Sequence, residues 1–355
     1  MLTLIIPTFN RPQFLARLLG YYRELSFPYT IVVADSSDAE HLIPNEAIIN
    51  SVRPDLTIEH RTYDTDIGIA TKLAESLETV GSPYSVLAAD DDFFVPESLR
   101  RGAEFLEANP DYSVVHGEAA KFGLPPEKAA YGPIVKVSRY NQRTVEFATG
   151  SERLVDHLVN GSTTWYSIQR TEQLRGNYRK TVEFESGAYF IELLPSCLSL
   201  IQGKAKKLDR LYMLRQTHSG SFSSSAVPLD WVASPDWTGL YERFCSRLAE
   251  ELAAQDGMGL EEAQRVVRRS FWPYLAGFLG RSGSKRRKRS PLLRAAGAVP
   301  GVRPVWRKLL RLKQRSGGDM SLASLRHPSS PYHADFMPIY EAVKTPPVEL
   351  DAILS

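Results

Sequence analysis

The sequence predicts an α/β fold with a mostly parallel sheet flanked by helices, followed by a mainly helical C-terminal region. Short β-rich runs alternate with longer helical patterns over roughly the first 120 residues. These strand-like runs are almost wholly apolar, which is typical of strands buried on both faces. Polar residues follow several of them, and in such sheets ligands bind beyond the carboxyl ends of the strands. We therefore expect a binding site along that edge.

The expected elements follow in chain order. Strands are expected at Leu2–Ile6, Thr30–Ala34, Leu56–His60, Tyr84–Ala89 and Tyr112–His116. Helices are expected between them at Gln13–Leu25, Pro44–Ser51, Ile69–Val80 and Pro96–Ala108. Residues 122–142 are rich in Pro, Gly and Tyr and are expected to form a loop. A second block adds helices at Ser151–Asn160 and Ser186–Gln202 and strands at Trp165–Arg170 and Lys207–Arg215. After a Ser- and Pro-rich stretch at 217–235, helices are expected at Trp237–Ala254 and Leu260–Gly280.

Charge is unevenly distributed along the 355 residues, although the net charge is only +2. The segment Arg281–Arg315 contains 13 Lys and Arg and no acid, so the rest of the chain has a net charge of −11. Met1 leads directly into a strand-like run, so we expect no signal peptide. No stretch of 18 apolar residues occurs, so we expect no membrane span. The two isolated cysteines suit a reducing compartment.

Three consecutive aspartates, Asp90, Asp91 and Asp92, directly follow an apolar strand-like run. Adjacent carboxylates repel one another, so the natural partner at a strand end is a hard divalent cation such as Mg²⁺ or Mn²⁺. Mg²⁺ typically takes one or two carboxylates and fills its other positions with water and substrate phosphates. We expect Asp92 to coordinate the metal, and Asp90 to face a ribose or the metal's surroundings. A solvated acidic turn is the alternative reading.

Further candidates lie at the other strand ends. Asp35 ends the second expected strand and can accept hydrogen bonds from a base or a ribose, or can cap the next helix. Asp66 precedes Gly68, whose missing side chain lets a ligand approach the backbone closely. Lys72 is near the start of the following helix and can face a diphosphate. A capping aspartate and a solvated lysine are the alternative for this last pair.

The ordered motifs resemble the signature of family 2 glycosyltransferases with the GT-A, Rossmann-like fold. They are Leu4-Ile5-Ile6-Pro7-Thr8-Phe9-Asn10-Arg11-Pro12, Val33-Ala34-Asp35-Ser36-Ser37, Asp66-Ile67-Gly68 and Asp90-Asp91-Asp92. The resemblance covers roughly residues 1–220 and implies a catalytic domain there, with a helical region at 221–355. It implies a nucleotide-diphosphate sugar donor, a DxD-type metal site and inversion at the anomeric carbon. The nucleotide-contacting positions that it implies are Thr8, Arg11, Asp35 and Asp66, with Asp90 and Asp91 beside them.

The same resemblance implies a catalytic base about 90–100 residues past the triplet, just ahead of a helix. Glu185 occupies that place and Glu183 is the reserve; capping or solvated acids are the alternative. His218 resembles the late histidine that some GT-A enzymes bring to the metal, and Arg215 can neutralise phosphate. The chain departs from the family pattern after the second strand, at Asp66, and near Lys72. The base and the sugar are therefore not specified.

The basic segment at 281–315 includes an apolar stripe with Trp306, which is typical of a helix on an anionic membrane surface. A basic face packed on the protein and a nucleic-acid patch are the other readings, and nucleic acid is the least favoured. We expect a cytoplasmic enzyme, in peripheral contact with the inner face of the membrane under the first reading. A glycan or lipid-linked acceptor is expected, as in surface polysaccharide assembly.

Two rival functions fit part of this pattern. A sugar-nucleotide nucleotidyltransferase also combines a parallel sheet with metal-binding carboxylates. Such enzymes usually carry a Gly-rich basic loop after the first strand, whereas Pro7–Pro12 contains no Gly and one Arg. A catalytically inactive scaffold that only binds a nucleotide is the second rival.

Overall fold

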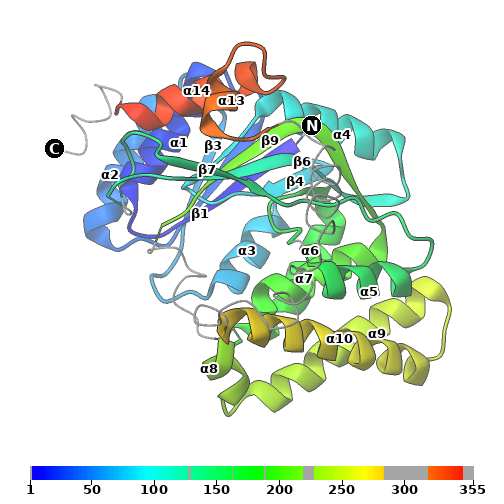
Figure 1. Cartoon of the computed structure of the whole chain (residues 1–355). Coiled ribbons are helices and arrows are strands. Elements are labelled where there is room, and N and C mark those ends of the chain that lie inside the picture. The colour runs from blue at the N-terminus through cyan, green and yellow to red at the C-terminus, as the bar shows by residue number, and fades with distance from the viewer. Residues whose placement is uncertain are drawn as a thin grey trace.

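The computed structural model describes residues 2–126, 129–161, 163–187, 189–218, 228–283 and 319–346. Within these ranges the strands form one mixed, nine-stranded sheet with helices on both faces (Figure 1). The order of its strands is β3-β2-β1-β4-β8-β6-β9-β5, and β7 pairs with β6.

The N-terminal part of the sheet is parallel, as predicted. Neighbouring strands β3, β2, β1 and β4 all run in the same direction, with Ile5 opposite Val32 and Leu4 opposite Val86. Their carboxyl ends therefore meet at one edge. The elements are β1 (Leu2–Thr8), α1 (Pro12–Glu24), β2 (Thr30–Asp35), α2 (Ala39–Val52), β3 (Ile58–Thr62), α3 (Ile69–Glu78) and β4 (Tyr84–Leu87).

The second half of the sheet mixes strand directions. Strand β8 runs antiparallel to both β4 and β6, whereas β6 and β9 are parallel. The short β5 begins at Asp92, which lies opposite Arg215 of β9. The elements are β5 (Asp92–Phe94), α4 (Pro96–Ala108), β6 (Tyr112–Gly123), β7 (Lys136–Tyr140), α5 (Gly150–Asn160), β8 (Ile168–Arg170), α6 (Thr171–Thr181), a 3₁₀ turn η1 (Val182–Phe184), α7 (Phe190–Gln202) and β9 (Lys204–Gln216).

The expected loop at 122–142 is wrong in part, because β7 forms within it and pairs antiparallel with β6. Strand β5 and helix α6 are among the other elements that were not expected. Strand β5 has three residues and α6 is unusually polar, so neither shows a clear apolar period. Strand β5 extends the sheet beside β9, and this pairing brings the end of β9 to the aspartate triplet.

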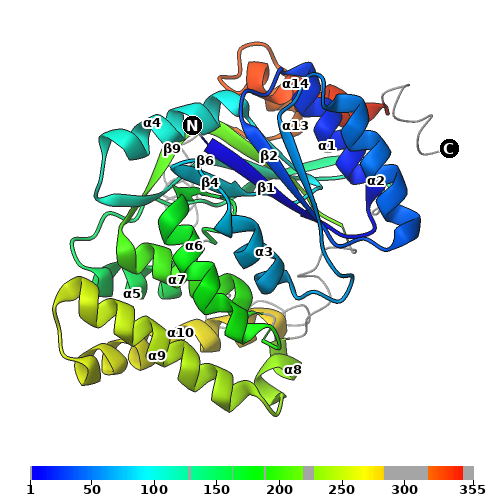
Figure 2. The same ribbon diagram turned by 180° about the vertical axis from the view of Figure 1, so that it is seen from behind.

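Two apolar cores fill the space between the sheet and its helices. One face of the sheet packs against α1, α2 and α4, and the other packs against α3 and α6 (Figure 2). A separate aromatic core forms below α5 and α7, where Phe190, Phe244 and Phe271 are fully buried. It is covered by α8 (Pro228–Ala233), α9 (Trp237–Asp256) and α10 (Leu260–Gly283). The Asp256 carboxylate fastens this layer to the amino end of α5, accepting hydrogen bonds from the Gly150 and Ser151 backbone N–H groups at 2.7 and 2.8 Å.

The last described helices, α13 (Leu322–Arg326) and α14 (His333–Lys344), return to the opposite face of the sheet (Figure 1). Phe336, Ile339 and Val343 of α14 are fully buried in the core that contains α1. The Gly132 N–H donates to the Val343 carbonyl at 2.9 Å, so α14 also holds the chain after β6. Almost all of the basic segment 281–315, and the expected boundary near residue 220, lie outside the described residues. No helix in the described ranges is long and apolar enough to cross a membrane.

We predict that Phe336→Ala lowers the free energy of unfolding by about 3–5 kcal/mol, because it leaves a cavity between α14 and α1. Urea denaturation measures this change. The matched control is Lys344→Ala on the exposed face of the same helix, which is expected to change stability by less than about 0.5 kcal/mol. Equal stability of the two variants would show that α14 does not support the main core.

Candidate active site

A pocket of about 630 Å³ lies where the carboxyl ends of β1, β2 and β4 meet. Its volume is within the usual range for small-molecule sites. Basic and acidic side chains share its wall, namely Arg11, Lys72, Asp90, Asp91, Glu185, Glu192 and Arg215. Aromatic rings from Phe9, Trp165 and Tyr166 complete it. The predicted convergence of strand ends is therefore present in the fold.

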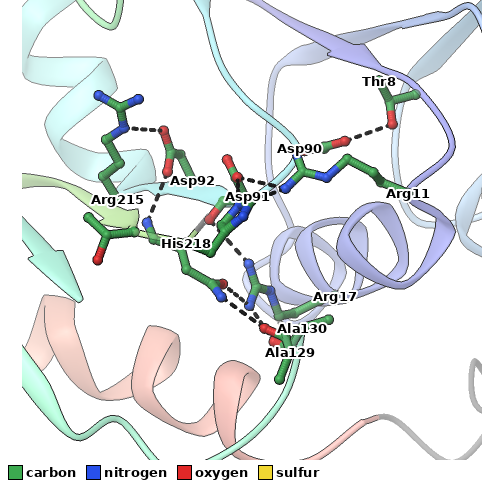
Figure 3. A network of polar contacts seen from close by, with 12 residues as sticks. Thr8, Arg11, Arg17, Asp90, Asp91, Asp92, Ala129, Ala130, Arg215 and His218 are labelled. Carbon is green, nitrogen blue, oxygen red and sulfur yellow. Dashed lines mark hydrogen bonds and ion pairs between the residues drawn. The ribbon is translucent and has the colours of Figure 1, made fainter. Parts of the chain in front are cut away.

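Arg11 bridges the first two aspartates of the triplet (Figure 3). Its guanidinium donates to Asp90 Oδ1 at 2.7 Å and to Asp91 Oδ2 at 2.9 Å. The Thr8 hydroxyl donates to Asp90 Oδ2 at 2.8 Å. His218 Nε2 lies 2.6 Å from Asp91 Oδ2, and the His218 ring stacks on Phe14. Both carboxylates line the pocket, and a cation from the start of α1 balances them.

Asp92 faces β9 and does not line this pocket. Its Oδ1 accepts a hydrogen bond from the Gln216 backbone N–H at 3.0 Å. Its Oδ2 lies 3.7 Å from Arg215 Nε and, within the described ranges, accepts no hydrogen bond although it is buried. The predicted metal pair is thus divided in this structure, because His218 contacts Asp91 and Asp92 contacts the end of β9.

Burial and charge shift the pKa of each aspartate differently. Burial raises the pKa of Asp90 to about 6, against the opposing effect of Arg11. Burial, with Asp91 as an adjacent like charge, raises the pKa of Asp92 well above its ordinary value. Burial also acts on Asp91, but the hydrogen bond with His218 and the charge of Arg11 outweigh it and lower its pKa to about 2. The triplet therefore needs a cation or a proton at Asp90 and Asp92.

A buried arginine, Arg17, supports the triplet from beneath, and the sequence reasoning missed it. Its side chain is 1% exposed, and it donates to Gln216 Oε1 at 2.6 Å, to the Asp91 carbonyl at 3.1 Å and to the Ala130 carbonyl. Burial lowers its pKa to about 10. The network joins α1, the end of β9 and the chain after β6 (Figure 3). The one available signal was a charged residue within an otherwise apolar stretch of helix.

Asp35 and Asp66 do not line the pocket. Asp35 is fully buried and accepts hydrogen bonds from Asn45 Nδ2 at 2.8 Å and the Ser37 N–H at 2.9 Å. Burial would raise its pKa, but the hydrogen bonds from His60, Ser37 and Asn45 lower it. Asp66 is exposed on the turn before α3. In this structure, therefore, neither carboxylate faces the pocket into which the sequence placed it.

Lys72 and Arg215 are the other predicted cations, and both line the pocket. Lys72 Nζ donates to Ser36 Oγ at 2.7 Å and to the Thr8 carbonyl at 3.1 Å. Burial lowers the pKa of Lys72 to about 8. Arg215 lies over the Tyr166 ring; burial opposes its charge, but Tyr166 and Asp92 together raise its pKa. The pocket thus holds cations on two sides of the triplet.

The two candidate bases differ in whether their side chains line the pocket. Glu185 lines the pocket, and its Oε1 accepts a hydrogen bond from the Thr71 N–H at 2.7 Å. Glu183 does not line it, and pairs with Arg247 Nε of α9 at 2.6 Å. A third acid that the sequence reasoning missed, Glu192, lines the pocket from the first turn of α7. No motif marks it, because its place depends on how α7 docks.

The predicted divalent ion can be compared with the groups present. Among the described residues, no three His, Cys, Asp or Glu side chains are grouped so as to hold a metal by themselves. Mg²⁺ and related ions need only one or two carboxylates when phosphate and water complete the shell. The buried Asp92 Oδ2, which lacks a donor among the described residues, and the nearby Asp91 fit such a partial site. The residues therefore suit a cation that binds together with a phosphorylated ligand.

We predict that Arg11→Gln lowers the free energy of unfolding by on the order of 3 kcal/mol at pH 8, because buried carboxylates lose their cation. The deficit should shrink at pH 5. In the folded wild type the pKa of Asp90, about 6, exceeds the unfolded value, so its contribution to stability falls as pH rises through this range. Losing Arg11 raises that pKa further and extends the fall to higher pH.

Chemical denaturation at pH 5 and pH 8 tests this expectation. Arg101→Gln is the matched control, because Arg101 pairs with exposed acids on α4. A deficit of the same size at both pH values would contradict the coupling between Arg11 and Asp90.

Three similar solved structures are crystal structures of residues 1–349 of TarS from S. aureus. The chain is 16% identical to each of them, with TM-scores of 0.52, 0.54 for a complex with UDP-GlcNAc and 0.53 for a complex with UDP. The alignments cover 96% of this chain and 88%, 89% and 88% of those chains. No family model matches the chain, and a search of curated proteins found no match. The likeness confirms the predicted fold: the chain has a GT-A-like fold with a mixed sheet flanked by helices and a helical C-terminal region.

Proposed function

We propose that this chain is a metal-dependent, inverting glycosyltransferase that moves a sugar from a nucleotide-diphosphate sugar to a hydroxyl acceptor in glycan assembly. One observation carries the proposal. In a GT-A-like fold, the carboxyl ends of β1, β2 and β4 open into one pocket lined by Asp90, Asp91, Lys72 and Arg215. The UDP-GlcNAc and UDP complexes of TarS support a UDP-sugar as the first donor to test.

The side chains on the pocket wall support a nucleotide-diphosphate donor. Lys72 and Arg215 supply positive charge for a diphosphate from two sides. Phe9 lines the pocket with 48% of its surface exposed, so its ring is free to stack on a base. Thr8 and Arg11 hold the Asp90 and Asp91 carboxylates by hydrogen bonds. Thr8 and Arg11 therefore affect the donor site through the positions of these carboxylates.

In this proposal Asp91 and Asp92 would hold Mg²⁺ or Mn²⁺ together with the donor's phosphates and water, and His218, which contacts Asp91 here, would join them only after a rearrangement. Such an ion offsets the charge that grows on a departing diphosphate. A carboxylate of the pocket takes the acceptor proton as the acceptor oxygen attacks the anomeric carbon through an oxocarbenium-like transition state. Glu185, the base expected from the resemblance, lines the pocket, whereas Glu183 is turned to α9.

A thermal-shift screen of nucleoside diphosphates and their sugars, with and without Mn²⁺, tests the proposal. We expect a UDP-type ligand to stabilise the chain only with the metal, by about 2.7 kcal/mol at 100 times its Kd. Asp92→Asn should abolish the metal-dependent part and lower donor turnover by about 100-fold or more. Released UDP reports turnover with a panel of hydroxyl acceptors. Binding without turnover on every acceptor would favour an inactive nucleotide-binding scaffold, and no binding at all would contradict the donor site.

We predict that UDP affinity in Mg²⁺ falls roughly 10-fold between pH 7 and pH 9, because Lys72, with a pKa of about 8, loses its charge over this range. Lys72→Met should bind UDP more weakly at pH 7 and lack this part of the pH dependence. Titration calorimetry on the two proteins separates the lysine from titration of the ligand itself. An equal pH dependence in both proteins would exclude Lys72 as a diphosphate contact.

A further inference from the structure

Two acids outside the aspartate triplet line the pocket, and they differ in what holds them. Glu185 comes from the turn after η1, and Glu192 comes from the first turn of α7, seven residues later. Both line the pocket that Asp90, Asp91 and Arg215 also line. The sequence pattern favoured Glu185 because it lies just ahead of the expected helix. The structure allows the two carboxylates to be compared by their contacts.

The Glu185 carboxylate is held by a hydrogen bond at the amino end of α3. Gly68 is the N-cap residue of α3 and offers no side chain, and the Thr71 N–H donates instead to Glu185 Oε1 at 2.7 Å. A Cβ atom at Gly68 would lie 2.1 Å from Glu185 Cδ, so the carboxylate sits directly on this glycine. Glu185 therefore acts as the cap of α3. Because Lys72 is the next residue after Thr71, the cap also positions that lysine in the pocket.

The Glu192 carboxylate caps no helix in the described part of the chain. Within the part of the chain that the structure describes, no hydrogen bond or ion pair holds its carboxylate, and Trp165, Tyr166 and Ile191 line the same pocket. Burial raises the pKa of Glu192, against the opposing charge of Arg215. A general base works best when its pKa is closer to the working pH than that of an ordinary carboxylate. A half-buried carboxylate without a structural partner fits that task.

We propose that Glu192, rather than Glu185, takes the proton of the acceptor hydroxyl; this assignment rests on the proposed glycosyl transfer. The acceptor O–H bond breaks and its proton moves to the Glu192 carboxylate while the acceptor oxygen bonds to the anomeric carbon. The bond from that carbon to the diphosphate oxygen breaks, and its electron pair leaves with the diphosphate. Glu185 is then a positioning residue that acts through α3 and Lys72.

The test compares Glu192→Gln and Glu185→Gln in the full chain, using Glu172→Gln as a matched control. Glu172 is on the exposed side of α6, outside the pocket. Three quantities are measured for each variant: kcat for sugar transfer against pH, Kd for UDP with Mn²⁺, and Tm. Glu192→Gln should lower kcat by roughly 10²–10⁴-fold and remove the acidic limb of its pH profile, with Kd for UDP within about 2-fold of wild type. Glu185→Gln should keep the acidic limb and lose less than about 10-fold in kcat, with a weaker Kd and a lower Tm.

A large kcat loss and a lost acidic limb in Glu185→Gln, with near-normal transfer in Glu192→Gln, would overturn the assignment. If Glu192→Gln does not fold, Glu192→Asp keeps a carboxylate, and its acidic limb must move relative to wild type; an unmoved limb also overturns the assignment. A wild-type chain that turns over no donor would contradict the proposed function itself, and the assignment would fall with it. A folded wild type that transfers sugar while Glu192→Gln does not is the supporting result.

Discussion

The salt bridges from Arg11 to Asp90 and Asp91 are the interaction on which the site depends. Three adjacent carboxylates at the buried end of a sheet repel one another and lose the solvation that water would give them. In the folded chain an arginine side chain lies close to each of the three aspartates. Arg11 at the start of α1 serves Asp90 and Asp91, and Arg215 of β9 approaches Asp92. This pairing shapes the wall of the pocket and leaves Asp92 Oδ2 without a donor among the described residues.

The layers around the sheet hold these charged groups in place. Helix α14 packs in the same core as α1, and the Arg17 network ties α1 to the Asp91 backbone and to Gln216. On the other side, α9 and α10 pack in one core with α7, the helix that carries Glu192. The helical C-terminal region therefore supports both walls of the pocket, although its two parts lie on opposite sides of the sheet (Figure 2). Changes far from the pocket in either part are expected to reach it through α1 or α7.

Much of the N-terminal half could be predicted from the sequence, because apolar strands and amphipathic helices there have clear periods. The positions of Asp90 and Asp91 in the pocket follow from the strand ends, and that of Lys72 follows from the start of the helix after the third strand. The sequence could not show which oxygen faces which neighbour. That choice depends on β5 and β9, which pair antiparallel at the triplet and turn Asp92 towards Gln216. Local patterns of three residues are too short to reveal such a pairing.

The remaining site residues were hidden for a related reason. Arg17 and Glu192 are charged residues on helices that otherwise bury apolar side chains, and their roles exist only after distant segments pack around them. Asp35 illustrates the reverse case. It ends a strand as predicted. Its carboxylate, however, already accepts hydrogen bonds from Asn45, Ser37 and His60 and does not face a ligand in the pocket. Motif order located the site, and tertiary contacts assigned the individual groups.

The most direct measurement is a crystal structure of the chain grown with Mn²⁺ and UDP, with anomalous data collected to locate manganese. The account predicts a manganese ion beside Asp91 and Asp92, with the diphosphate between it and Lys72 and the base near Phe9. Arg11 should remain on Asp90. A nucleotide bound elsewhere, or a pocket that stays empty while Asp92 keeps its present contacts with Gln216 and Arg215, would contradict the account.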